Sequence, residues 1–236
     1  MHLAPIVHVS FDFWRTLFKS NSQFSKARVD LLHEHFNPKK LNVIQISSII
    51  EEIGDAVDKI NKITLQSVSG SEMNAALLLK MGVYSSPNVL NDFEKRVGDL
   101  FIKFPPNLIA LNTYSIFDRL LEKGITISLA SNTAFICGDL LDTILSNAKL
   151  SNQFLFKVYS DKINRSKPSS DFFSNVYHTA CSYNKKVKNK ACVLHVGDDF
   201  YADIEGAKNF GFSFYQINSN EASLNDIFNE TNNFGI

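Results

Sequence analysis

The distribution of short apolar runs along this 236-residue chain constrains its fold more than any other feature. Five runs have the length and the β-branched and aromatic composition of buried strands. They span residues 6–12, 125–130, 154–159, 192–196 and 212–217. Helical patterns separate most of them, as at 112–123 and 169–183. This alternation predicts an α/β fold with a Rossmann-like, doubly wound parallel sheet.

The stretch from about residue 22 to 104 lacks strand-like runs and shows helical periodicity instead. Apolar side chains recur there at three- and four-residue steps, at Ile46, Ile49, Ile50, Ile53, Val57 and Ile60. Two more helical segments follow at 72–80, which includes Leu79, and at 90–104, before Pro105 and Pro106. Proline ends a helix because it lacks an amide donor. We expect an all-helical insertion after the first strand, with its apolar side chains in the core.

Charge and cysteine content narrow the class of function. The 24 basic and 24 acidic side chains cancel, so no positive field favours nucleic acid. Three scattered cysteines suggest neither a disulfide framework nor a zinc site. No signal-peptide pattern or membrane-spanning apolar window is visible. We therefore expect a cytoplasmic protein that acts on a small molecule, as a monomer or homodimer, without nucleic-acid or membrane partners.

Polar residues gather where the predicted strands end. They are Asp12 and Thr16 after the first run, Ser131 and Asn132 after the second, Lys167 before a helix, and Asp198 and Asp203 after the fourth. In an open parallel sheet, ligands bind beyond the carboxyl ends of the strands, so we expect these side chains to converge.

The convergence of these residue types has a chemical meaning. Three carboxylates repel one another, so a divalent cation with oxygen ligands, Mg²⁺, is their natural partner. A serine hydroxyl and a lysine ammonium can donate to the oxygens of a phosphoryl group, where charge resides in the transition state. The pattern therefore favours metal-dependent phosphoryl chemistry.

The four motifs, in this order, resemble those of the haloacid-dehalogenase-like (HAD) hydrolase superfamily, and GDDFYADIEGAKNFG is the most specific of them. The resemblance implies a core formed by residues 1–20 and 106–236. Residues 21–105 would then form a helical cap, which many members carry after the first motif. It also implies a Mg²⁺-dependent hydrolase, most simply a phosphatase that acts on a small phosphorylated metabolite.

The resemblance assigns a role to each matching residue. Asp12 would attack phosphorus and form an aspartyl phosphate, while Ser131 and Lys167 hold the transferred group. Thr16 would orient the loop, with Asn132 and Arg15 near the substrate. The metal ligands would be Asp12, the backbone carbonyl of Trp14, Asp198 and Asp203. Asp199 is interpreted as a helix N-cap, and His195 as a core histidine.

Trp14 departs from the family pattern, which usually places a second Asp two residues after the nucleophile as general acid and base. An indole cannot replace it, and such catalysis contributes about 10²- to 10⁴-fold. Either substrates carry good leaving groups, or a cap residue such as His33 or His35 substitutes, or the protein binds without turnover. Trp14 itself is interpreted as either a stacking surface for substrate or a packing residue.

Three alternatives therefore stay open. The chain could be a binding or regulatory protein with a degenerate site. It could also be a dehalogenase-like hydrolase, although those enzymes need no metal and the acids of GDDFYAD argue against them. A phosphonoacetaldehyde hydrolase would need a reactive cap lysine, and none stands out among Lys39, Lys40, Lys59, Lys62 and Lys80.

Overall fold

A computed structural model describes residues 5–110 and 112–217. Its centre is a five-stranded, entirely parallel sheet with the order β5-β4-β1-β6-β7. The strands are β1 (His8–Phe11), β4 (Thr126–Ser131), β5 (Phe156–Tyr159), β6 (Val193–Gly197) and β7 (Ser213–Gln216). All five lie within the predicted runs or overlap them, so the predicted doubly wound α/β class is confirmed.

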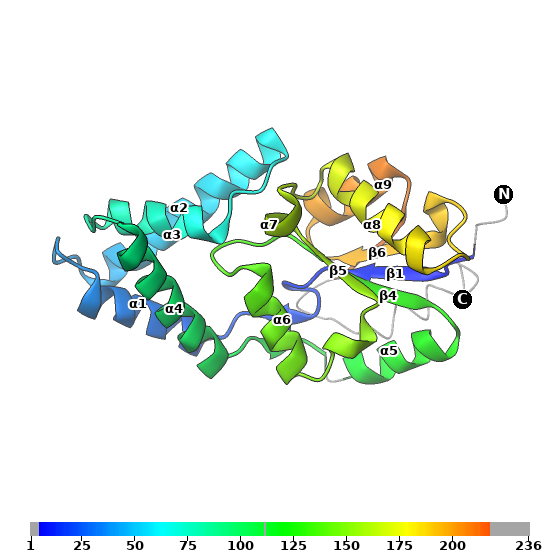
Figure 1. The fold of residues 1–236 in the computed structure, drawn as a ribbon, viewed down its shortest axis with the longest axis horizontal. Helices are drawn as coiled ribbons and strands as arrows, with labels where there is room; N and C mark the ends of the chain where they lie inside the picture. The colour runs from blue at the N-terminus through cyan, green and yellow to red at the C-terminus, as the bar shows by residue number, and fades with distance from the viewer. Residues whose placement is uncertain (1–4, 111, 218–236) are drawn as a thin grey trace.

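Helices cover both faces of the sheet (Figure 1). On one face lie α5 (Thr113–Glu122) and α6 (Gly138–Asn147), and on the other lie α8 (Ser170–Tyr183) and α9 (Gly206–Phe210). All four residues of β1 are buried, as expected for the central strand of a parallel sheet. Its Phe11 packs against Phe117 of α5, while His195 of β6 meets Phe173 of α8 on the opposite face.

The insertion consists of four helices that lie beside the core (Figure 1). They are α1 (Ser22–His35), α2 (Val43–Thr64), α3 (Gly70–Lys80) and α4 (Pro87–Lys103). Local chemistry fixes where they begin. Asn42 and Ser69 each form a reciprocal capping box, and Ser86 caps α4 ahead of a proline at the first helical position. The predicted all-helical cap is therefore present.

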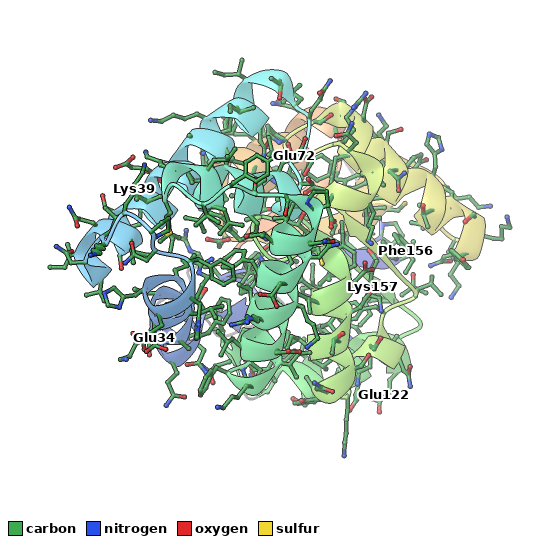
Figure 2. All side chains as sticks on the ribbon, turned by 60° about the vertical axis from the view of Figure 1, so that its left-hand side comes forward. Glu34, Lys39, Glu72, Glu122, Phe156 and Lys157 are labelled. Carbon is green, nitrogen blue, oxygen red and sulfur yellow. The ribbon has the colours of Figure 1, made fainter. Side chains whose placement is uncertain are left out.

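The residues buried in the insertion are not all those that the helical periodicity predicted. Ile46, Ile50, Ile53 and Val57 of α2 are buried as predicted. Ile60, however, is 46% exposed and Leu79 of α3 is 58% exposed, so their prediction as core residues was wrong. Other side chains are buried in α2 and α3 instead, Asn61 in one and Leu77 and Leu78 in the other. Figure 2 shows Glu34, of α1, and Lys39, of the loop between α1 and α2, at the outer edge of the insertion.

Smaller elements complete the chain. A two-stranded antiparallel ribbon joins β2 (Phe18–Lys19) to β3 (Asn107–Leu108), the two points where the chain leaves and re-enters the core. The remaining short segments are α7 (Ser160–Ile163), η1 (Ser151–Gln153), η2 (Lys190–Cys192) and the π-helical turn η3 (Phe200–Glu205). Within the described ranges, no helix combines the length and apolar character that crossing a membrane requires.

Candidate active site

Asp12 stands directly after the central strand β1 and anchors the site. Its backbone N–H donates to the Val196 carbonyl of β6 at 2.9 Å, so the neighbouring strand fixes its position. Ser131 is the last residue of β4, and Asp198 follows β6. The carboxyl ends of three adjacent strands therefore bring these side chains to one edge of the sheet, as the sequence predicts.

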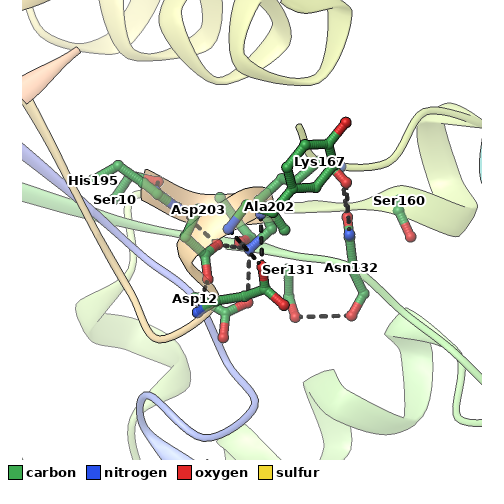
Figure 3. Close-up of polar contacts among 12 residues, drawn as sticks. Ser10, Asp12, Ser131, Asn132, Ser160, Lys167, His195, Ala202 and Asp203 are labelled. Atoms are coloured by element: carbon green, nitrogen blue, oxygen red, sulfur yellow. Dashed lines mark hydrogen bonds and ion pairs between the residues drawn. The ribbon is translucent and has the colours of Figure 1, made fainter. Parts of the chain in front are cut away.

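Lys167 holds two of the carboxylates together (Figure 3). Its Nζ lies 2.7 Å from Asp12 Oδ1 and 2.6 Å from Asp203 Oδ1, and it also donates to the Ala130 carbonyl at 2.9 Å. The three ammonium hydrogens thus have three acceptors. Burial alone would lower the pKa of Lys167, but the two carboxylates raise it above its ordinary value, so the ammonium stays charged.

The carboxylates respond differently to the same surroundings. Burial raises the pKa of Asp12 to about 7, with Asp203 and Asp198 adding to the shift and Lys167 opposing it. Burial also acts to raise the pKa of Asp203, but Lys167 and His195 hold it well below its usual range. Burial therefore dominates at Asp12, whereas the charged and hydrogen-bonding partners dominate at Asp203.

His195 is a site residue whose role the sequence did not reveal. It is a buried histidine of β6, as predicted, but its Nε2 also lies 3.0 Å from Asp203 Oδ1. Its Nδ1 lies 3.2 Å from Ser10 Oγ on β1. The ring therefore fixes the Asp203 carboxylate from beneath the sheet edge. The sequence feature that could have indicated this role is the presence of two polar residues, Ser10 and His195, inside apolar strands.

Asp199 and the π-helical turn η3 place Asp203. The Asp199 carboxylate accepts hydrogen bonds from the Tyr201 and Ala202 amides, so its interpretation as an N-cap is confirmed. Its own N–H donates to Asp203 Oδ2 at 3.1 Å. A π-turn is rare and occurs often at functional sites, since it re-aims a side chain within a short segment.

Asp198 and Arg15 lie at the open side of the site. Arg15 Nε is 3.0 Å from Asp198 Oδ2, and the arginine side chain is 69% exposed. Burial raises the pKa of Asp198, and the guanidinium opposes this. Arg15 also has a φ of +60°, a left-handed conformation that is uncommon for a residue with a side chain.

Ser131, Asn132 and Thr16 have different surroundings. The Asn132 side chain bonds both backbone groups of Lys167, accepting from its N–H at 2.8 Å and donating to its carbonyl at 3.1 Å. Ser131 is buried, and its hydroxyl donates to the Asn132 carbonyl at 3.1 Å. Thr16 is buried and its hydroxyl has no partner in the described part of the chain, so no hydrogen bond supports its expected role in orienting the loop.

The donor set fits a hard divalent cation. Asp12, Asp198 and Asp203 each offer a carboxylate oxygen, and these three oxygens lie within 4.8 Å of one another. Oxygen ligands of this kind are those that Mg²⁺ prefers. Asp12 and Asp203 share one buried ammonium, that of Lys167, and a bound cation would offset the negative charge that this lysine leaves.

A cavity of about 250 Å³ opens above these groups and is roofed by the insertion. The core lines it with Asp12, Lys167, Asp198 and Asp203, and Trp14 and Phe135 form part of its wall. The insertion contributes Gly54, Val57, Asp58, Asn61 and Lys62 from α2 and Met73 from α3. His33 and His35 are exposed on α1 and do not line the cavity. The structure therefore does not bring them to Asp12 as substitutes for the missing acid.

No protein-family model matches the sequence, and no curated protein matches it either. The structure nevertheless aligns with solved structures over most of its length. YfnB from Bacillus subtilis, a HAD-hydrolase bound to magnesium, shares 15% identity over 97% of this chain and 99% of its own, with a TM-score of 0.65. This chain has the HAD fold.

Proteins with the same HAD fold carry out different reactions. An L-2-haloacid dehalogenase from Xanthobacter autotrophicus is 19% identical, with a TM-score of 0.60 over 97% of this chain and 83% of its own. A predicted phosphoglycolate phosphatase from Haemophilus somnus is 14% identical, with a TM-score of 0.62 over 91% and 86%. The HAD fold alone therefore does not distinguish phosphatase from dehalogenase chemistry. Only the side chains of the site can distinguish them.

Proposed function

We propose that this protein is a Mg²⁺-dependent hydrolase of phosphorylated small molecules that works through Asp12. The observation that carries the proposal is the cluster of three carboxylates around one buried lysine, at the base of a cavity roofed by the insertion. A dehalogenase has no use for this concentration of acids, because its reaction needs no metal. The magnesium bound to YfnB, a protein of the same fold, is consistent with the proposal.

The reaction would proceed in two displacements at phosphorus. A carboxylate oxygen of Asp12 attacks phosphorus, the bond to the leaving oxygen breaks, and an aspartyl phosphate results. Water then attacks the same phosphorus, which releases phosphate and restores the carboxylate. Lys167 fixes Asp12 for attack and, with Ser131, would donate to the phosphoryl oxygens. Asp12, Asp198, Asp203 and the Trp14 carbonyl would hold Mg²⁺, which neutralises charge on the transferred group.

Trp14 determines which substrates would react. A leaving oxygen that is expelled from phosphorus needs a proton unless it is already a weak base, and an indole cannot supply one. Acyl and aryl phosphates have weakly basic leaving groups and would therefore be preferred to alkyl phosphates. Asp58 of α2 lines the same cavity and is a carboxylate, but it pairs with Lys62, whose Nζ lies 2.9 Å from Asp58 Oδ2.

Lys62 bears on the phosphonoacetaldehyde hydrolase alternative. It is a lysine of the insertion that lines the cavity, as that chemistry would require. A lysine that forms a Schiff base must be available as a neutral amine. The hydrogen bond that Lys62 donates to the Asp58 carboxylate instead raises the pKa of Lys62, which keeps it protonated. The structure therefore favours a role for Lys62 in binding an anionic substrate.

The deciding experiment is steady-state phosphate release from a panel of acyl, aryl and alkyl phosphates, with Mg²⁺ and with a chelator. We expect turnover that requires metal and is fastest with acyl and aryl phosphates. Asp12→Asn should lower the rate by about 10³-fold or more, since it removes the nucleophile. Metal binding by calorimetry without turnover of any substrate would instead identify a binding protein, and release of halide from haloacids would identify a dehalogenase.

A further inference from the structure

A second cavity, also of about 250 Å³, lies next to the catalytic cavity. Trp14, Ala134 and Phe135 line both cavities, whereas Asp12 lines the catalytic cavity alone. The second cavity is otherwise formed by the start of α1, the end of α4 and the loop after β4, through Ser20, Asn21, Phe24, Ser25, Arg28, Phe101 and Ile136. We call it the Arg28 cavity.

Arg28 has no counter-ion. Its Nε is shielded from solvent and has no hydrogen-bond partner, and the guanidinium pairs with no carboxylate of the described residues. Arg15, Arg96 and Arg165, in contrast, each have an aspartate within 3.1 Å. Partial burial lowers the pKa of Arg28 to about 10, because it disfavours the charged form. Arg28 is half-buried, and a shielded polar atom without a partner, such as its Nε, is costly to the fold.

Aromatic rings give Arg28 its present contacts. Its guanidinium carbon lies 5.6 Å from the centre of the Phe24 ring and 5.0 Å from that of Phe135. Such cation–π contacts contribute about 0.5–2 kcal/mol, which offsets only part of the cost of burying a charge. The two rings also hold the planar donor fork in place. A guanidinium fixed in this way is suited to bidentate binding of a carboxylate.

The other walls select an apolar ligand body. Trp14, Phe24, Phe101, Phe135 and Ile136 are all large and apolar. Asn21 also lines the cavity, but its side chain is occupied, since it caps α1 and donates to the Pro105 carbonyl. Ser20 and Ser25 add two hydroxyls, but a cavity with one charged donor and mainly apolar walls matches a small organic acid better than a fully hydrated anion such as free phosphate.

We propose that the Arg28 cavity binds the carboxylate of a small organic acid that has an apolar or aromatic body. Arg28 supplies the counter-charge, and the shared wall at Trp14 makes the occupant a neighbour of any molecule at Asp12. The carboxylate can belong to the far end of the substrate or to a separate ligand. The binding itself does not depend on the proposed hydrolysis, and its assignment as part of the substrate does.

The protein contains a built-in reporter for this binding. Trp14 is the single tryptophan of the chain and lines the cavity, so its fluorescence senses an occupant. We expect a saturable fluorescence change when phenylacetate is added to the full-length protein, and little change with phenylacetamide, its uncharged analogue. Calorimetry on the same pairs gives the affinity independently of any optical signal.

Variants test whether Arg28 is responsible. Arg28→Met should weaken phenylacetate binding by about tenfold or more, since it removes a charge-assisted bidentate contact. It should also melt at or above the temperature of the parent protein, because it removes an Nε that is shielded from solvent without a partner. Arg165→Met, a control at an arginine outside the cavity, should bind as the parent does. Equal binding by Arg28→Met, or no heat and no fluorescence change with phenylacetate, benzoate and hexanoate, would overturn the proposal.

Kinetics distinguish the two sources of the carboxylate. If it belongs to the substrate, Arg28→Met should raise KM for carboxyphenyl phosphate and leave KM for phenyl phosphate unchanged. If it belongs to a separate ligand, phenylacetate should alter kcat for phenyl phosphate without competing with it. A protein that binds phenylacetate through Arg28 but releases no phosphate would support the cavity and refute the hydrolase.

Discussion

The carboxyl carbon of Asp203 lies only 2.2 Å from the position that a β carbon on residue 197 would occupy. The turn after β6 folds back so tightly that the Asp203 side chain occupies the position of a β carbon on residue 197. Gly197→Ala should therefore displace the Asp203 carboxylate from Lys167 and His195. We expect Mg²⁺ affinity, measured by calorimetry, to fall by about tenfold or more, with a parallel loss of activity.

Gly54 provides the matched control for this substitution. It lies within α2 and lines the catalytic cavity, and a β carbon added to it would have no other atom within 4 Å. Gly54→Ala should stabilise the protein by about 0.5–1 kcal/mol in urea denaturation, because alanine favours the helix. If both alanine variants lost metal to the same degree, the close packing at Gly197 would not be the cause.

Lys167 should contribute far more to stability than a surface lysine. Lys167→Met leaves the buried carboxylates of Asp12 and Asp203 without their cation, and breaking such a pair costs about 3–5 kcal/mol. Lys162→Met removes an exposed pair with Asp139 and should cost less than about 1 kcal/mol. Urea denaturation of the two variants measures the difference. Mg²⁺ should restore part of the loss in Lys167→Met only, and comparable losses in both would contradict the assignment.

The substrate preference should change when residue 14 gains an acid. Trp14→Asp should raise kcat/KM for alkyl phosphates by about tenfold or more, within the range that general acid catalysis supplies. Acyl phosphates should gain little, because their leaving groups need no proton. Trp14→Phe keeps an aromatic ring without a titratable group and should give no such gain. A uniform change across all leaving groups would show that Trp14 acts through packing.

His8 should make stability depend on pH away from the active site. It is fully buried on β1 between Thr126 and Ser128, and burial lowers its pKa from 6.5 to about 3. Below pH 6.5 the unfolded chain therefore binds a proton that the folded chain does not. The free energy of unfolding consequently falls as the pH is lowered. This group alone should cost about 2 kcal/mol at pH 5 relative to pH 8.

Urea denaturation across this pH range tests that expectation. His8→Gln should unfold with a smaller loss of stability between pH 8 and pH 5 than the parent protein. Proton NMR gives a second measurement, in which the His8 ring should remain neutral at pH 5. A ring that titrates near pH 6.5 in the folded protein would contradict it.

The sequence predicted those parts of the site that follow from strand direction. Asp12, Ser131 and Asp198 meet because each follows a parallel strand, and strand-like runs are visible in the chain. The N-cap role of Asp199 was also predictable, since it depends only on the next few residues. Such local and directional rules need no knowledge of side-chain packing.

Other features of the site and fold depend on side-chain packing, which the periodicity of the sequence does not reveal. His195 was expected in the core, but its contact with Asp203 requires the π-turn, which no local signal announces. Helix α6 was not predicted, and Cys137 gives it no side-chain cap. The surroundings of Arg28 also depend on packing, because it is half-buried with Phe135, from the loop after β4, against its guanidinium.

The order of the strands has a consequence for how the chain is made. β1 leads into Asp12, the proposed nucleophile, and is the central strand, yet its His8 meets its first partner on β4 118 residues later. At about 5–20 residues per second, a ribosome would leave this apolar strand unpaired for several seconds or longer. The four helices of the insertion, which emerge in the interval, pack largely on one another. Newly made chains are therefore expected to hold a folded insertion beside an open sheet edge, a form that molecular chaperones recognise.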